Sequence, residues 1–311
     1  MGNKQINRLI KKIKERSLLR SLNLRLRLAG RIRNANVFSE YINQKDFYAL
    51  SKRFKNTINS FRHDTEAIPQ KSDYIFTSWL QGEDNAPEIV KACINSWRRL
   101  PNKKVVVIDK NKINQYITLP DHINEKWEKG LISNAHYSDI LRTGILLKYG
   151  GCWVDATVFL SSRTFPKYIE KSCFFMFQNV SLSRKDKQYC IPSNWFIYSE
   201  TNNPVLQLTY DLLIEYWKHY NYAFNYFVYH LFFTIAAQKF ESYWNKVPVY
   251  SNQPPHILQF ELSNEFSVER WNEIVRMSDI HKLNWRHQDS KNGLLTFHRY
   301  IVESDRKTSA T

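Results

Sequence analysis

Long apolar runs, paired cysteines and repeats are all missing from this sequence. No stretch reaches the roughly 18 to 20 apolar residues that a membrane-spanning helix needs, and the amino-terminus lacks the apolar core and cleavage site of a signal peptide. The cysteines form no CxxC pair and have no spacing to histidine that suits zinc; they are Cys93, Cys152, Cys173 and Cys190. We therefore expect a cytoplasmic protein with free, buried thiols.

The composition is that of a globular, enzyme-sized protein. Its 311 residues are 43% hydrophobic and 15% aromatic, which is too apolar for disorder and enough for one large α/β domain or two smaller ones. The formal net charge of +16 suggests a polyanionic partner, either nucleic acid or an anionic membrane surface. Residues 1–55 carry +12 of this charge, with fifteen Lys and Arg against three acids. Because a nucleic-acid-binding body would spread basic residues over its surface, no nucleic acid is expected.

The basic amino-terminal segment has an apolar stripe. Over residues 4–33, Ile and Leu alternate with Lys and Arg, and the first half follows helical spacing at Ile6, Leu9, Ile10 and Ile13. Such a helix can lie on an anionic bilayer, or it can pack on its own domain or on a partner. The pattern leaves both open, and it does not decide whether residues 22–28 form a strand or continue the helix.

The rest of the chain alternates strands and helices. A polar segment at 63–73 with Pro69 separates a mainly helical arm, residues 1–70, from a catalytic body, residues 71–311. A strand at 74–80, a helix at 87–100 with Pro87 in its first turn, and a buried strand at 103–109 predict a parallel βαβ unit. The other predicted elements are helices at 134–149, 204–219 and 222–240, and strands at 152–160, 173–178, 194–198 and 294–298. The predicted fold class is α/β, with a mostly parallel central sheet flanked by helices.

One segment concentrates the chemistry. Asp139 and Arg142 lie three residues apart on a predicted helix, where they form either an ordinary surface pair or a grip on sugar hydroxyls at the mouth of a cleft. The Gly150-Gly151 pair allows a left-handed helix end and a close backbone approach. Asp155 ends the next strand, where open α/β sheets bind ligands. A carboxylate buried alone there would cost several kcal/mol, so we expect a partner.

Three sequence blocks carry a family resemblance: Trp79 to Gly82, Ser138 to Arg142, and Tyr149 to Thr157. In this order and spacing they resemble the bacterial capsular polysaccharide synthesis proteins, within the wider class of glycosyltransferases with a DXD sugar-binding motif. The resemblance spans about residues 72 to 300. It implies a GT-A-like fold for the body.

The resemblance also implies roles for individual residues. Trp79 would stack on the donor's uracil, the catalytic pair Asp139 and Arg142 would bind the donor sugar, and Gly150 and Gly151 would lie on the donor side. Asp155 matches the first Asp of the motif, which contacts the ribose and a Mn²⁺ or Mg²⁺ ion. Thr157 stands where the second Asp would be, which puts strict dependence on this divalent cation in doubt because a hydroxyl is a weak ligand for it.

Two further segments match the family. The stretch Ser278 to Arg286 resembles a carboxyl-terminal element that closes over the donor diphosphate, so His281 and Lys282 are candidates to ligate metal or neutralise phosphate. Ser193, Asn194 and Trp195 match a segment on the acceptor side. His136 is interpreted as a hydrogen-bonded helix start.

The function implied is transfer of a sugar from a nucleotide sugar, expected to be UDP-linked, to a growing saccharide acceptor of a capsular or cell-surface polysaccharide, with retention of configuration. The acceptor would be lipid-linked, and residues 1–55 would hold the protein on the inner face of the cell membrane. A scaffold subunit with a decayed donor site is the first alternative, since Thr157 fits it too, and a nucleic-acid-binding protein that uses the basic arm is the second.

Overall fold

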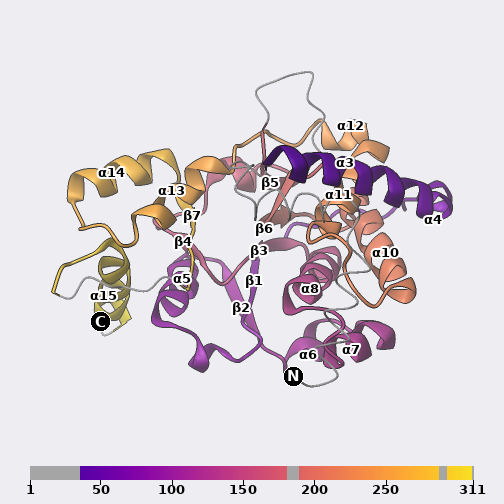
Figure 1. The fold of residues 1–311 in the computed structure, drawn as a ribbon. Helices are drawn as coiled ribbons and strands as arrows, with labels where there is room; N and C mark the ends of the chain where they lie inside the picture. Colours follow the sequence, from indigo (N-terminus) through magenta and orange to yellow (C-terminus); the bar gives the residue numbers. More distant parts are fainter. Residues whose placement is uncertain (1–35, 181–188, 287–292, 310–311) are drawn as a thin grey trace, which may run out of the picture.

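The computed structural model describes residues 36–180, 189–286 and 293–309 (Figure 1). The stripe predicted within residues 4–33 lies outside these ranges. No helix in the described part of the chain is long and apolar enough to cross a bilayer.

A five-stranded sheet forms the centre of the molecule, in the order β2-β1-β3-β6-β5. Its strands are β1 (Tyr74–Ser78), β2 (Lys104–Ile108), β3 (Gly151–Val154), β5 (Phe174–Gln178) and β6 (Pro192–Ser199). Strand β1 pairs in parallel with β2 and β3, whereas β6 is antiparallel to β3 and β5. Four of the five strands therefore run in one direction, and the α/β class with a mostly parallel sheet is confirmed.

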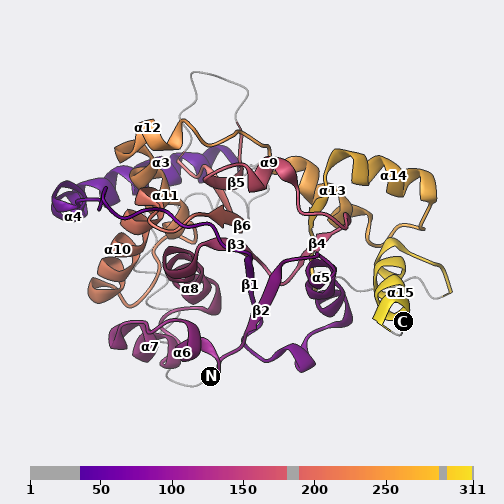
Figure 2. The same cartoon turned by 180° about the vertical axis from the view of Figure 1, so that it is seen from behind.

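Helices cover the sheet on both sides (Figures 1 and 2). On one side lie α8 (Asn134–Tyr149), α10 (Pro204–His219) and α11 (Val228–Lys239). On the other side are α5 (Glu88–Arg98), α13 (Gln253–Glu261), α14 (Val268–Met277) and α15 (Phe297–Ser309), with a small antiparallel sheet of β4 (Val158–Leu160) and β7 (Ile280–Lys282). The remaining elements are α3 (Asn36–Arg53), α4 (Lys55–Ser60), η1 (Glu83–Asn85), α6 (Ile113–Tyr116), α7 (Asp121–Glu128), α9 (Lys167–Glu170) and α12 (Glu241–Trp244).

The strands alternate between two hydrophobic cores. Phe76 and Trp153 pack with α8, α10 and α11, while Ile75, Cys152 and Val154 pack with α5. Successive side chains of a strand point to opposite faces. The residue two positions after Trp153, which is Asp155, therefore belongs to the side that α8 covers.

Three predicted elements differ from the structure. The strand predicted at 152–160 is divided, because residues 155–157 turn between β3 and β4, with Val158 N donating to Asp155 O at 2.9 Å. The strand predicted at 294–298 is wrong: α15 begins at Phe297, and Thr296 Oγ1 accepts from Arg299 N at 3.3 Å. The helix predicted at 222–240 begins only at Val228.

The amino-terminal side of residue 70 takes part in the main core. Phe47, Leu50 and Phe54 are buried in the cluster that α8, α10 and α11 share. Helix α3 lies along α11 (Figure 1). Residues on both sides of the predicted boundary at residue 70 therefore share one hydrophobic core. All four cysteines are free, as predicted, but Cys173 is exposed.

Candidate active site

A cavity of about 430 Å³ opens beyond the carboxyl ends of β1 and β3. This is the place where open α/β sheets bind ligands. The cavity brings together seven of the predicted site residues: Trp79, Asp139, Arg142, Asp155, Thr157, Asn194 and Lys282. They come from the residue after β1, from α8, the β3–β4 turn, β6 and β7, so distant parts of the sequence converge on one place.

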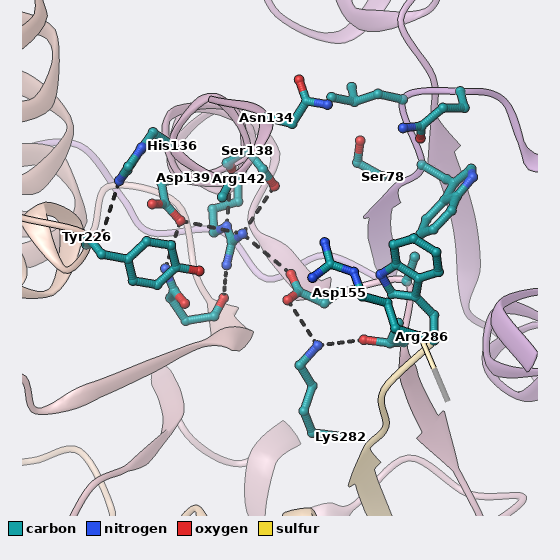
Figure 3. Close-up of a pocket in the computed structure, with 18 of the residues that line it drawn as sticks. Ser78, Asn134, His136, Ser138, Asp139, Arg142, Asp155, Tyr226, Lys282 and Arg286 are labelled. Carbon is teal, nitrogen blue, oxygen red and sulfur yellow. Dashed lines mark hydrogen bonds and ion pairs between the residues drawn. The ribbon is translucent and has the colours of Figure 1, made fainter. Parts of the chain in front are cut away.

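Asp155 is held between two cations (Figure 3). Its Oδ1 lies 3.4 Å from Arg142 Nη2 and accepts a hydrogen bond from Trp153 Nε1 at 3.2 Å. Its Oδ2 lies 3.5 Å from Lys282 Nζ. The backbone is fixed as well, because Asp155 N donates to Trp195 O at 2.8 Å. The partners expected for a carboxylate in this position are thus a guanidinium on one side and an ammonium on the other.

Arg142 is fixed from several directions. Its Nε donates to Ser138 O and its Nη2 to Ser138 Oγ, both at 3.1 Å, and Nη1 donates to Asn194 O. The guanidinium also lies over the Trp153 ring, 5.4 Å from its centroid. These contacts leave the guanidinium one orientation, in which it faces the cavity and both carboxylates.

Asp139 is a buried acid beside Arg142. Its Oδ1 lies 3.5 Å from Arg142 Nη2 and accepts from Asn194 Nδ2 at 2.8 Å. The side chains are only 11% and 6% exposed, so the pair is not an ordinary surface pair. Burial, with a smaller contribution from the Asp155 carboxylate, raises the pKa of Asp139 to about 7 against the lowering effects of Arg142 and Asn194. Near neutral pH this carboxyl can therefore accept or donate a hydrogen bond.

Lys282 reaches the cavity from β7. Its Nζ donates to Thr157 Oγ1 at 2.5 Å while facing Asp155. The ladder between β4 and β7 sets this position, since Val158 pairs with Lys282 and Leu283 N donates to Thr157 O at 2.9 Å.

His281 points away from the cavity. It is fully buried, its Nε2 lies 3.0 Å from Ser161 Oγ, and its ring packs near Phe159. Neighbouring residues of a strand face opposite sides, so Lys282 and His281 cannot both reach Asp155. Burial also lowers the pKa of His281 to about 3. The structure therefore does not support His281 as a metal ligand.

The glycine pair lies at the other end of β3. Gly150 and Gly151 have positive φ angles of 64° and 87°, and a Cβ on Gly151 would come within 2.4 Å of Tyr74 O. Gly150 precedes β3 and Gly151 begins it, at the end of the strand away from Asp155, and neither residue lines the cavity. Their backbone conformations let the helix end and two strands pack closely.

Aromatic and basic residues that the sequence prediction missed complete the cavity. Trp285 packs edge-to-face against Trp79, with ring centroids 5.7 Å apart, and Arg286 lies over the Trp285 ring. The Trp79 indole Nε1 is buried without a hydrogen-bond partner among the described residues. The only sequence signal for Trp285 and Arg286 is that both lie in the family-like segment Ser278 to Arg286.

His136 is the hydrogen-bonded helix start that was predicted. Its Nδ1 lies 2.8 Å from Ser133 Oγ, the N-cap of α8, and its Nε2 lies 3.2 Å from Tyr226 O. Burial lowers the pKa of its imidazole. His136 and Tyr226 both line the cavity beside α8 (Figure 3).

A second cavity of about 610 Å³ adjoins the first through Asn194 and His230, which line both. The predicted acceptor-side residues Ser193, Asn194 and Trp195 all line it. Trp195 stacks on Phe177 with ring centroids 5.0 Å apart, and Ser193 Oγ accepts from Asn252 Nδ2 at 2.9 Å.

Helix α3 contributes to this second cavity. Glu40 and Asn43 line it, and Asn225 Nδ2 donates to Asn43 Oδ1 at 3.1 Å and to Asp46 Oδ2 at 2.7 Å. Nothing in the sequence connected these residues of the basic segment to a ligand site.

The atoms expected to hold a divalent cation do not fit one. Asp155 Oδ2 and Thr157 Oγ1, the nearest oxygens of the motif, both face Lys282 Nζ. Among the described residues, no group of three or more His, Cys, Asp or Glu side chains could hold a metal ion. A hydroxyl and a carboxylate that share an ammonium are a poor set for Mn²⁺ or Mg²⁺, which take several oxygen ligands.

Comparison with known proteins gives a family match and matches among solved structures. The family described as capsular polysaccharide synthesis protein matches residues 29–301. No curated protein matches the chain. Among solved structures, the PaToxG glycosyltransferase is similar at 16% identity, with a TM-score of 0.39 over 66% of this chain and 81% of that chain.

Proposed function

This chain belongs to the capsular polysaccharide synthesis protein family, and from that premise we propose that it is a glycosyltransferase. It would move a sugar from a UDP-sugar to a growing saccharide of a capsular or cell-surface polysaccharide.

One observation carries this proposal: Asp155 held between Arg142 and Lys282 in a cavity at the carboxyl ends of the strands. Transfer from a nucleotide sugar needs a grip on the diphosphate leaving group, a fixed sugar and an acceptor hydroxyl close to the anomeric carbon. Positioning and preorganised charge supply most of the rate enhancement in such reactions. The cations of the cavity would stabilise the negative charge of the departing diphosphate.

The donor would lie across the cavity from Trp79 to α8. The Trp79 indole, supported by Trp285, offers a flat apolar surface for the uracil. At the other end, the Asp139 carboxyl and the Arg142 guanidinium would hold hydroxyls of the donor sugar, the carboxyl mainly as acceptor and the guanidinium as donor.

The acceptor would enter through the second cavity. Its lining combines an indole, amides and a carboxylate, from Trp195, Asn252 and Glu40, which is a suitable mixture for a saccharide. Because Asn194 and His230 line both cavities, an acceptor there would meet the donor sugar beside Asp139.

We propose retention of the anomeric configuration. Among the described residues that line the donor cavity, Asp155 is held between two cations, which makes it a poor general base, and Asp139 would hold the hydroxyls of the donor sugar. An inverting reaction would instead require a base on the acceptor side, such as Glu40. Proton NMR of the first product formed, which distinguishes the two anomers, decides between them.

The basic arm would hold the enzyme on the inner face of the membrane, beside a lipid-linked acceptor. Residues 1–55 carry +12 of the net charge, and each Lys or Arg near an anionic surface contributes about 1 kcal/mol.

The test is calorimetry of the full-length protein with UDP, GDP, CMP and their sugars, followed by an assay of donor hydrolysis and sugar transfer. We expect binding of one nucleotide class and loss of transfer by at least about 100-fold in Asp155→Ala. Asp211→Asn is the matched control, since this acid lies on α10 and contacts Gln207, away from the cavity. No nucleotide binding would refute the proposal, and tight UDP binding without transfer or hydrolysis would favour the scaffold alternative.

A further inference from the structure

The Lys282 ammonium occupies the position between Asp155 and residue 157. Nζ lies 3.5 Å from Asp155 Oδ2 and donates to Thr157 Oγ1 at 2.5 Å. The side chain is 22% exposed and lines the cavity. In a motif with two Asp residues, these two positions would share a divalent cation.

The charges of the two arrangements balance in the same way. Two carboxylates need two positive charges, which a divalent cation supplies. Asp155 with Thr157 has only one negative charge at these positions, and the single positive charge of Lys282 offsets it. Thr157 and Lys282 together therefore stand in place of a second Asp and a divalent cation. A lone carboxylate with a hydroxyl would bind such a cation weakly.

Lys282 also keeps donor capacity for a ligand. An ammonium group has three N–H donors, of which the contacts to Asp155 and Thr157 use two. Arg286 lines the same cavity and adds a second positive charge. A diphosphate entering between them would meet one cation on β7 and another just after it.

We propose that Lys282 takes the place of the divalent cation, so that the donor diphosphate binds without metal. This inference rests on the proposed function and adds that the leaving group is stabilised by protein cations alone. No covalent step involves Lys282; it offers its positive charge and hydrogen bonds to the phosphate oxygens.

The experiment is calorimetry with UDP on the full-length protein after treatment with EDTA, repeated with Mn²⁺ and with Mg²⁺. We expect dissociation constants that agree within about threefold in all three conditions, because the cation is part of the chain. Lys282→Met, which keeps length but not charge, should bind UDP at least about 10-fold more weakly. Lys246→Met, at an exposed position outside the cavity, is the matched control and should bind as the wild type does.

The outcomes separate this inference from the proposed function. UDP binding that requires Mn²⁺ or Mg²⁺ would overturn the role of Lys282 and leave the glycosyltransferase proposal standing. Equal UDP binding by Lys282→Met and Lys246→Met would also overturn it. If no nucleotide binds under any condition, the proposed function itself fails. Thermal unfolding of each variant shows whether lost binding reflects lost folding.

Discussion

At the scale of single residues, the notable feature of the site is that two carboxylates share two cations. Asp155 faces two cations, and the neighbouring Asp139 shares one of them, Arg142. Removing one partner of a buried charge pair costs about 3 to 5 kcal/mol, because the other charge is left uncompensated. Each of these side chains should therefore contribute to folding, and conservative substitutions test the proposed binding roles best.

Asp139 makes stability depend on pH. Its pKa is about 7 in the folded protein against 3.8 as the ordinary value, so the folded state holds a proton that the unfolded chain releases between these values. The free energy of unfolding should then fall as the pH rises from about 4 to about 7, by at most about 1.4 kcal/mol per pH unit from this group. Asp139→Asn should lose this dependence. Urea unfolding of both proteins at pH 5, 6, 7 and 8 measures the difference.

The other groups around Asp139 are present in both proteins. Arg142, Asp155 and Asn194 are unchanged in Asp139→Asn, so the difference between the two stability curves isolates the one carboxyl. Parallel curves across this pH range would show that Asp139 is ionised throughout and that its burial is fully compensated.

A double variant can restore the arrangement with two carboxylates at residues 155 and 157. In the double variant Thr157→Asp/Lys282→Ala, two carboxylates replace the carboxylate and ammonium. We expect this variant to bind UDP at least about 10-fold more tightly with Mn²⁺ than with EDTA, since two carboxylates are ligands that Mn²⁺ accepts. The same UDP affinity in both conditions would contradict the charge argument.

At the scale of elements, the junction between α8 and β3 fixes the sheet. A methyl group on Gly151 would meet Tyr74 O at 2.4 Å, whereas one on Gly130, just after α7, would meet nothing within 4 Å. Both glycines have positive φ angles, of 87° and 67°.

Gly151→Ala should therefore destabilise the protein by about 3 kcal/mol or more, from backbone strain and a clash with β1. Gly130→Ala carries the strain alone and should cost about 1 to 2 kcal/mol. Denaturant unfolding of the two variants compares them. Equal losses would mean that β1 moves away from Gly151 at no cost.

The elements also show what the sequence could predict. Strong patterns, such as the βαβ unit and α8 with Asp139 and Arg142 on one face, were predicted correctly because each depends on local spacing. The run 294–298 was not, because a short apolar segment fits a strand or a buried helix start equally well. Strand β7 has three residues, too few for any periodicity, so nothing in the pattern showed which of His281 and Lys282 would face Asp155.

The same limit applies to the cavity as a whole. Trp285, His230 and Glu40 come from three unconnected parts of the chain, and only tertiary packing brings them to the site. The place of the glycine pair could not be predicted for a related reason: the sequence shows that the chain turns there but not which edge of the sheet the turn occupies.

At the scale of the whole molecule, the charge and the core contacts of the basic segment come from different parts of it. Residues 1–35 carry eleven of the fifteen Lys and Arg found in residues 1–55. Helix α3 follows and contributes Phe47, Leu50 and Phe54 to the main core. Binding to a membrane and folding should therefore separate at residue 35 and not at residue 55.

Deletion of residues 1–35 should abolish flotation with anionic vesicles at moderate salt and leave the free energy of unfolding unchanged. Each basic residue near the surface contributes about 1 kcal/mol to such binding. Neutral vesicles are the control for apolar insertion. If the shortened protein floats as well as the full chain, the arm is not the membrane contact.

The register of β7 against β4 decides which side chain of β7 faces Asp155. It pairs with β4 so that Lys282 lies opposite Val158 and His281 opposite Phe159. A slip of one residue in a ladder exchanges every side chain between the two faces. Inserting a single residue into the loop between α14 and β7, with the strand re-pairing, would withdraw the ammonium and present the His281 imidazole to Asp155 and Thr157. A site with an ammonium and a site with an imidazole, the side chain that titrates near neutral pH and binds transition metals, are thus one residue apart in this fold.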